Sequence, residues 1–139
     1  MKIRVLITAL TGLIFLSIGI AQAVPADGVY NGKILKSSKC KLSTGDQRAC
    51  WSLTVQLDSG KVMEVRLWGF GAVIYNSNGK VLYKGPFDSE QDMKIKLYTA
   101  VGYLKKGVNV RMDNVSCGNS DELLPNIAPW CETSTIYIK

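Results

Sequence analysis

The stretch WSLTVQLDSGKVMEVRLW, residues 51–68, alternates apolar and polar side chains on both sides of a short turn. A period of two is typical of a β-strand with one buried and one exposed face. The turn at residues 58–61 contains a glycine, as tight hairpin turns commonly do. The apolar side chains that share a phase are Trp51, Leu53, Val55 and Leu57 in the first run and Met63, Val65 and Leu67 in the second. The sequence therefore predicts an antiparallel hairpin that buries these side chains.

Shorter runs elsewhere predict further strands. The expected strands are residues 28–37, 72–75, 80–84, 108–113 and 135–138. Two of them, AVIY and KVLYK, flank the segment NSNG and form a second hairpin. Asn78 and Gly79 in this segment tolerate the positive φ that hairpin turns require. The chain is therefore expected to be mainly β.

One stretch changes to a helical period. Within DSEQDMKIKLYTAVGYLKKG, residues 88–107, the apolar side chains follow the spacing of one buried helix face. They are Met93, Leu97, Ala100, Val101 and Leu104. Ser89 followed by Asp92 resembles a capping box, and Gly107 is a suitable C-terminal stop. We therefore expect one helix here. Its lysines, interpreted as a solvated face, are Lys94, Lys96, Lys105 and Lys106.

The order of these elements, β-β-β-hairpin-α-β-β, narrows the fold. Three consecutive strands, a helix and two more strands is the order of the OB-fold, a five-stranded Greek-key barrel that binds oligomers. A generic α+β sheet with one covering helix has the same content and is the alternative. We expect a mainly β fold with one helix, either an OB-like small barrel or such a sheet.

Residues 1–23 predict export. Two cationic residues precede an uncharged apolar run at residues 5–20, and a small-x-small cleavage site follows at residues 21–23. This is the pattern of a secretory signal peptide. The run is shorter than the ~20 apolar residues that a membrane helix needs. We expect cleavage near Ala23, one domain at residues 24–139, no membrane span, and a secreted or periplasmic location.

Four cysteines follow the predicted signal peptide: Cys40, Cys50, Cys117 and Cys131. An even number in an exported domain indicates two disulfides. Of the three possible pairings we expect Cys40–Cys50 and Cys117–Cys131, because each pair closes a polar, turn-like loop. The spacing does not resemble a zinc site, and the chain has no histidine to complete one. No metal is therefore expected.

The expected mature chain is mildly basic. The signal peptide contains two of the 17 Lys and Arg, which leaves 15 against 11 Asp and Glu and a net charge of +4. This charge favours anionic partners such as acidic glycans or lipid headgroups, although a solvated basic surface accounts for it equally well. The chain has no block of Lys and Arg like those of nucleic-acid-binding tails, so no nucleic-acid partner is expected.

The residues do not form a recognisable catalytic set. The absence of histidine excludes Ser-His-Asp and Cys-His catalysis, and the cysteines are expected to be oxidised. The acidic residues lie mostly in expected turns and at the start of the helix, where turn and cap chemistry accounts for them. The segment GFG at residues 69–71 lacks the rest of a dinucleotide-binding loop. We therefore expect a protein that is not an enzyme and needs no cofactor.

Candidate ligand-binding residues lie at the end of the first hairpin. If the alternation holds, Glu64, Arg66 and Trp68 share its polar face. A tryptophan beside an arginine can stack on a sugar ring while the guanidinium binds an anionic group. Gly69 and Gly71 follow at once, however, and glycines in a strand often mark a bulge or corner. The alternative is therefore that the chain turns here and buries Trp68 under the sheet.

Two segments resemble a family of secreted proteins. KCKLSTGDQRACW, residues 39–51, has a cysteine pair flanking a turn and runs into a strand. LYTAVGYLKKGVNVRM, residues 97–112, has a helix that ends in glycine and leads into a strand, with a late cysteine pair after it. With the signal peptide and the domain size, this layout resembles the receptor-binding B subunits of bacterial toxins of the pertussis and subtilase type. The resemblance implies an OB-fold, a ring of five subunits and binding of host glycans.

The resemblance concerns the order of the elements and the cysteines more than the identity of individual residues. The region between Trp51 and Asp88 is longer here by a hairpin, and no binding residues carry over. Small exported bacterial proteins with the same helix-glycine-strand-cysteine ending are similar too, and they imply no defined function. The leading hypothesis is an exported binding module for glycans or another anionic surface, forming a homo-oligomer of five if it is toxin-like. The alternative is a periplasmic structural or protein-interaction protein without a small-molecule ligand.

Overall fold

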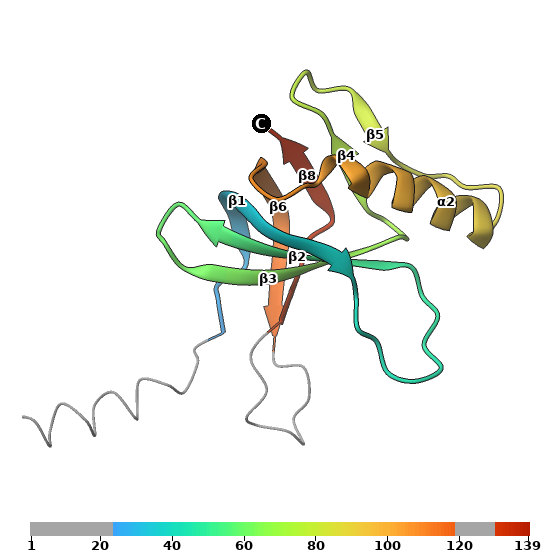
Figure 1. Cartoon of the computed structure of the whole chain (residues 1–139), viewed down its shortest axis with the longest axis horizontal. Helices are drawn as coiled ribbons and strands as arrows, with labels where there is room; N and C mark the ends of the chain where they lie inside the picture. The colour runs from blue at the N-terminus through green and yellow to red at the C-terminus, as the bar shows by residue number, and fades with distance from the viewer. Residues whose placement is uncertain (1–23, 119–129) are drawn as a thin grey trace, which may run out of the picture.

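The computed structural model describes residues 24–118 and 130–139, and Figure 1 shows strands wrapped around one another with a single helix beside them. The elements are β1 (Gly28–Lys39), β2 (Cys50–Leu57), β3 (Val62–Trp68), β4 (Val73–Tyr75), β5 (Val81–Tyr83), α2 (Glu90–Ala100), η1 (Val101–Tyr103), β6 (Asn109–Gly118), β7 (Trp130–Glu132) and β8 (Thr135–Ile138). The signal peptide predicted at residues 1–23 lies outside the described residues.

Five strands close into a barrel in the order β1-β2-β3-β7-β6 and back to β1. β3 and β7 run parallel, and the other neighbours in this ring are antiparallel. The pairing of β1 with β6 is the one that closes the ring, so the structure is not an open sheet with a covering helix. A closed, mixed, five-stranded barrel with one helix confirms the predicted mainly β fold, and its strand order is OB-like.

β1 can pair with two neighbours because it bends and because Gly32 leaves room at the crossing. The register between β1 and β2 shifts between Ile34 and Lys36. A Cβ atom at Gly32 would lie 2.5 Å from the backbone oxygen of Gln56 and 2.6 Å from Cγ1 of Val55. No side chain fits at this distance, so only glycine allows β1 to lie this close to β2.

The apolar face predicted for the first hairpin fills the barrel. Its side chains from Leu53 to Leu67 are at most 9% exposed. Trp51 is the exception, because it is half-buried at the end of the barrel and packs against the core. Its indole N–H donates a hydrogen bond to Oγ of Ser37 at 2.6 Å, and its ring centroid lies 6.0 Å from that of Tyr98 on α2.

The strand that closes the barrel differs from the predicted one. The sequence predicts residues 135–138 as the last barrel strand, but β7 takes that place between β3 and β6. β8 lies outside the ring, antiparallel to β6 and parallel to β4, and so connects the β4–β5 hairpin to the barrel. Thr133 and Ser134 separate the two strands, and the buried hydroxyl of Thr133 donates to the backbone oxygen of Asp113 at 2.6 Å. A strand of three residues is too short for a period of two to reveal it.

The helix begins where the sequence predicts. Ser89 is its N-cap, and its Oγ accepts a hydrogen bond from the backbone N–H of Asp92 at 3.0 Å. The α-helix ends at Ala100 and continues as the 3-10 turn η1, which is earlier than the stop predicted at Gly107. The predicted apolar stripe is buried against the barrel: Met93, Leu97, Ala100, Val101 and Leu104.

Two disulfides join the predicted local pairs. Cys40 is bonded to Cys50, and Cys117 is bonded to Cys131. Two such bonds indicate an oxidising compartment outside the cytoplasm. In the described part of the chain, no helix is both long enough and apolar enough to cross a membrane.

Candidate functional site

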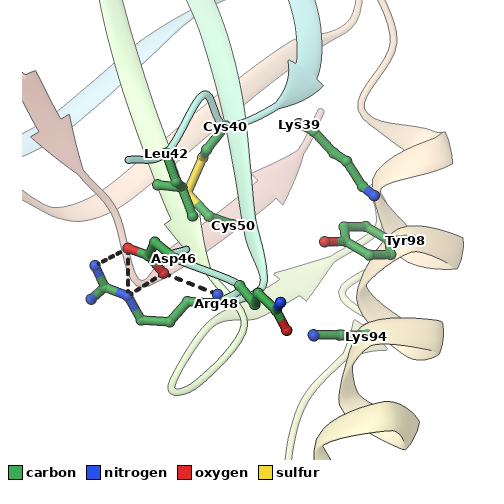
Figure 2. A pocket seen from close by; sticks show the side chains of 9 residues that line it. Lys39, Cys40, Leu42, Asp46, Arg48, Cys50, Lys94 and Tyr98 are labelled. Carbon is green, nitrogen blue, oxygen red and sulfur yellow. Dashed lines mark hydrogen bonds and ion pairs between the residues drawn. A yellow bond between two sulfur atoms is a disulfide. The ribbon is translucent and has the colours of Figure 1, made fainter. Parts of the chain in front are cut away.

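The loop between β1 and β2 is held by covalent and polar bonds. The disulfide Cys40–Cys50 closes its base. In its middle, the guanidinium of Arg48 donates to both carboxylate oxygens of Asp46, from Nε to Oδ1 at 3.1 Å and from Nη2 to Oδ2 at 2.7 Å (Figure 2). The backbone N–H of Arg48 also donates to Asp46, at 3.1 Å. These hydrogen bonds from Arg48 lower the pKa of Asp46 to about 2. The loop therefore presents Arg48 in a defined orientation.

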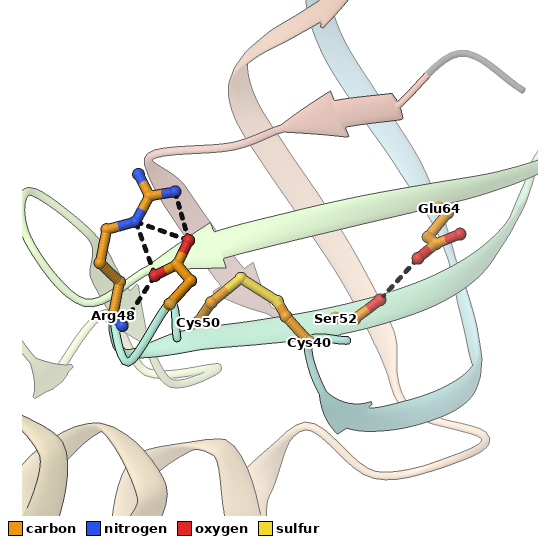
Figure 3. Close-up of a disulfide and its surroundings, with 6 residues drawn as sticks. Cys40, Arg48, Cys50, Ser52 and Glu64 are labelled. Atoms are coloured by element: carbon orange, nitrogen blue, oxygen red, sulfur yellow. Dashed lines mark hydrogen bonds and ion pairs between the residues drawn. A yellow bond between two sulfur atoms is a disulfide. The ribbon is translucent and has the colours of Figure 1, made fainter. Parts of the chain in front are cut away.

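The predicted site residues lie in one row on the outer face of β3. Thr54 pairs with Glu64, Ser52 pairs with Arg66 and Cys50 pairs with Trp68. The Ser52 hydroxyl donates to Oε1 of Glu64 at 3.1 Å (Figure 3). Glu64 is exposed, whereas Arg66 and Trp68 are half-buried. The row places an aromatic ring, a cation and an anion on the side of the barrel wall that faces away from the core.

Trp68 keeps the alternation of β3 and does not turn into the core. Gly69, the next residue, is the buried one, and the Phe70 side chain after it is 70% exposed. The guanidinium carbon of Arg48 lies 4.4 Å from the centroid of the Trp68 ring, which is a cation–π contact. The β1–β2 loop therefore covers part of the Trp68 ring and leaves the rest accessible.

An open pocket of about 210 Å³ lies beside Trp68, between the β3–β4 turn and the ends of β6 and β7. Trp68 and Phe70 are its aromatic residues. Its polar lining residues are Asn114, Ser116, Glu132, Thr133 and Ser134. Glu132 stands opposite Arg66 in the parallel β3–β7 register and opposite Ser116 in the β6–β7 register. The pocket thus combines aromatic surface with amide, hydroxyl and carboxylate groups, a set of groups that can bind a polyhydroxylated ligand.

Asn114 has an unusual backbone conformation at the rim of this pocket. Its φ is 52°, and it is the one non-glycine residue with positive φ in residues 24–118 and 130–139. Asparagine tolerates this region better than most residues. The pairing of β6 with β1 shifts in register next to it, so Asn114 occupies an irregular position in the strand. This irregularity leaves Asn114 exposed beside the pocket.

Sequence reasoning missed Arg48 and the polar side of the pocket. The hairpin register alone indicates that Cys50 pairs with Trp68, so a residue two positions before Cys50 could have been placed near the tryptophan. No comparable signal existed for Asn114, Ser116 and Glu132. They reach the pocket through the closure of β6 and β7 onto β3, which depends on the three-residue strand β7.

Over the described ranges, no three His, Cys, Asp or Glu side chains converge to hold a metal ion. Comparison with known proteins does not extend the description: no protein-family model matches the chain, and no curated protein or solved structure is significantly similar to it. The resemblance to toxin B subunits therefore reaches only as far as the small, five-stranded mixed barrel.

Proposed function

We propose that this protein is an exported, non-enzymatic module that binds glycans on the outer face of β2 and β3, with Trp68 as the central contact. The observation that carries the proposal is the position of Trp68, half-buried on a polar face and next to a pocket of hydroxyl, amide and carboxylate groups. A partly exposed indole with polar neighbours provides one apolar surface and several hydrogen-bonding partners in one place.

The chemistry of a sugar ring matches this surface. One face of a pyranose presents C–H groups, which pack on an aromatic ring, while its hydroxyl groups need donors and acceptors at the edge. Asn114 and Glu132 offer an amide and a carboxylate at the edge of the Trp68 pocket. Arg48, from the β1–β2 loop, makes the cation–π contact with the indole and places a positive charge next to it. Neutral and acidic sugars can both be bound in this way.

The position on the fold agrees with the proposal by analogy. OB-fold barrels bind oligomeric ligands on the face of their second and third strands, next to the loop between the first and second. Glu64, Arg66 and Trp68 occupy this face, and Arg48 belongs to this loop. Because fold alone does not determine function, the analogy supports the location and leaves the ligand to the chemistry of the residues.

The cellular setting in this proposal is outside the cytoplasm, either secreted or periplasmic. A toxin-like role would add a homo-oligomeric ring of five subunits that presents five copies of the Trp68 surface. Native mass spectrometry of the mature protein, residues 24–139, tests this part. A pentamer is expected if the role is toxin-like, and a monomer contradicts it.

Glycan binding is tested with the mature protein on a glycan array, followed by calorimetry on the best ligand. Trp68→Ala is expected to weaken binding about 30-fold, because removing a central tryptophan contact typically costs about 2 kcal/mol. Tyr103→Ala is the matched control, since Tyr103 on η1 is 57% exposed and does not line the Trp68 pocket. An empty array, or equal affinity of the two variants, overturns the proposal.

The second candidate is a structural or protein-interaction protein without a small-molecule ligand. The observation that favours it is on the helix, where the apolar side chains of Ile95 and Tyr103 are each 57% exposed. Ile95 lies on α2 and Tyr103 at the end of η1, so both belong to the same helical segment. A copurifying protein that is lost on Ile95→Ser or Tyr103→Ser, but retained on Trp68→Ala, would favour this candidate.

A further inference from the structure

A second pocket lies between the β1–β2 loop and helix α2. Its volume is about 340 Å³, and it is bounded by the disulfide Cys40–Cys50 at the base of the loop. Figure 2 shows Lys94 and Tyr98 extending from α2 toward the loop, and Lys39 extending from the end of β1 toward the helix. The disulfide and the helix thus form two walls that are distant in sequence and side by side in space.

The lining of this pocket is positively charged. The pocket is lined by three cationic residues, Lys39, Arg48 and Lys94, and by one acidic residue, Asp46, which leaves two positive charges in excess. Asp46 is already paired with Arg48 at 2.7 Å. The negative charge of Asp46 is therefore largely balanced by Arg48, and the two lysines provide the excess positive charge.

Lys94 is set apart from the other helix lysines. Its side chain is 26% exposed, whereas that of Lys96 is 53% exposed and pairs with Asp92 at 3.1 Å. Lys94 is therefore less exposed to solvent than the lysine face predicted from the sequence. Its Nζ lies 3.7 Å from a carboxylate oxygen of Glu90, which is 61% exposed and does not line the pocket. Exposed pairs of this kind contribute only about 0–1 kcal/mol, so a ligand can compete for the ammonium group.

The geometry suits a tetrahedral oxyanion better than a carboxylate. Lys39 and Lys94 reach the pocket from different elements, and the Nζ of Lys39 lies 4.7 Å from the centroid of the Tyr98 ring. Two ammonium groups act as separate point charges, which suits an anion with three or more acceptor oxygens, such as a sulfate or phosphate ester. The one guanidinium in the pocket, which would suit a planar carboxylate, already binds Asp46.

Arg48 links this pocket to the Trp68 surface. Arg48 lines the basic pocket, and its guanidinium carbon lies 4.4 Å from the centroid of the Trp68 ring. The basic pocket and the Trp68 surface therefore adjoin each other at Arg48. A chain of sugar units with an anionic substituent has the shape and the chemistry to occupy both positions.

We propose that the pocket between the β1–β2 loop and α2 binds a sulfate or phosphate ester carried by a saccharide whose adjoining ring lies on Trp68. The proposal rests on the glycan-binding function and specifies its ligand class. The ester oxygens accept hydrogen bonds from Lys39 and Lys94, and the Tyr98 ring borders the anion. The saccharide, rather than a free anion, is the ligand because the Trp68 surface adds contacts that an inorganic ion cannot make.

The test uses calorimetry with a sulfated tetrasaccharide, the same tetrasaccharide after desulfation, and inorganic sulfate. The variant Lys39→Gln/Lys94→Gln is compared with Lys105→Gln/Lys106→Gln, which removes the same charge from exposed residues outside the pocket. The pocket variant is expected to bind the sulfated tetrasaccharide at least tenfold more weakly, because a hydrogen bond to a charged group contributes about 1.5–3 kcal/mol. The control variant is expected to stay within about threefold of the wild type, and both variants should keep the wild-type unfolding midpoint.

Each outcome is decisive. Loss of sulfate-dependent affinity in the pocket variant alone, with unchanged binding of the desulfated tetrasaccharide, supports the proposal. Equal losses in the two double variants indicate unspecific charge attraction and overturn it. Inorganic sulfate that binds as tightly as the sulfated tetrasaccharide overturns it too, in favour of a free-anion site. If Trp68→Ala leaves the desulfated tetrasaccharide bound as before, the glycan-binding proposal fails separately.

Discussion

At the scale of single residues, Gly69 allows helix α2 to pack on the barrel without a side chain between them. A Cβ atom at this position would lie 2.9 Å from Cβ of Ala49 and 3.1 Å from Sδ of Met93. The backbone oxygen of Gly69 also accepts a hydrogen bond from the buried hydroxyl of Tyr83 at 2.6 Å. The backbone of Gly69 is therefore held between Met93 of the helix and Tyr83. The side chains of Trp68 and Phe70, before and after it, lie on the outside of the barrel.

Replacing Gly69 by alanine is expected to lower the free energy of unfolding by about 1–3 kcal/mol, the usual cost of adding a methyl group to a filled site. Urea unfolding followed by tryptophan fluorescence measures the change. Gly102→Ala is the control, because a Cβ atom there would meet no heavy atom within 4 Å. The control is expected to be neutral or slightly stabilising, since alanine restricts the unfolded chain. Equal effects of the two substitutions would contradict this account of Gly69.

The Asp46–Arg48 pair makes the order of the β1–β2 loop depend on pH. The hydrogen bonds from Arg48 lower the pKa of Asp46 from 3.8 to about 2. A folded-state pKa below the unfolded value stabilises the fold above pH 3.8, and this contribution is lost as the pH falls toward about 2. In a carbon-13 NMR titration we expect the Asp46 carboxyl group to titrate near pH 2 and, in Arg48→Gln, closer to 3.8. An unchanged midpoint in the variant would show that Arg48 does not set it.

At the scale of elements, local pattern predicts those elements whose neighbours are close in sequence. The hairpin of β2 and β3 pairs along its whole length, and α2 starts at its predicted cap. The pattern fails for β7, which is three residues long and owes its place to β3 and β6. It also misses the end of α2, where the chain tightens into η1 before Gly107. Tertiary contacts determine the position of β7 and the end of α2, and such contacts cannot be read from local sequence patterns.

The same division applies to the candidate site. Residues on β3 could be predicted because alternation places Glu64, Arg66 and Trp68 on one face. The sequence left open whether Trp68 stays on this face, because Gly69 and Gly71 follow it. In the structure Gly69 packs against the helix, and Trp68 remains on the outer face. Glu132 and Asn114 come from strands that the barrel closure brings to Trp68. No periodicity relates them to β3.

At the scale of the whole molecule, the barrel depends on the short strand β7. It connects β3 to β6 through few pairs, and the disulfide Cys117–Cys131 joins directly opposed residues of β6 and β7. This disulfide therefore links two neighbouring strands of the closed barrel, β6 and β7. The other disulfide, Cys40–Cys50, closes a loop at its edge.

Replacing both Cys117 and Cys131 by alanine is expected to lower the free energy of unfolding by about 3 kcal/mol. This is the usual effect of removing a disulfide that closes a loop of this length. Hydrogen exchange should also show lost amide protection along β6 and β3, because β7 is released from both. In the control, Cys40→Ala/Cys50→Ala, a similar loss of stability is expected with protection of β6 retained. Identical exchange patterns in the two variants would argue against a special role of the β6–β7 bond.

Barrel closure also bears on solubility at high concentration. Because the ring pairs β1 with β6, β5 is the strand at the open end of the sheet order among the described residues. β5 has only three residues, and lysines stand directly before and after it in KVLYK. Short edges flanked by lysine offer a second copy little backbone to pair with and repel it by charge. These features of β5 therefore disfavour strand-by-strand aggregation at this edge.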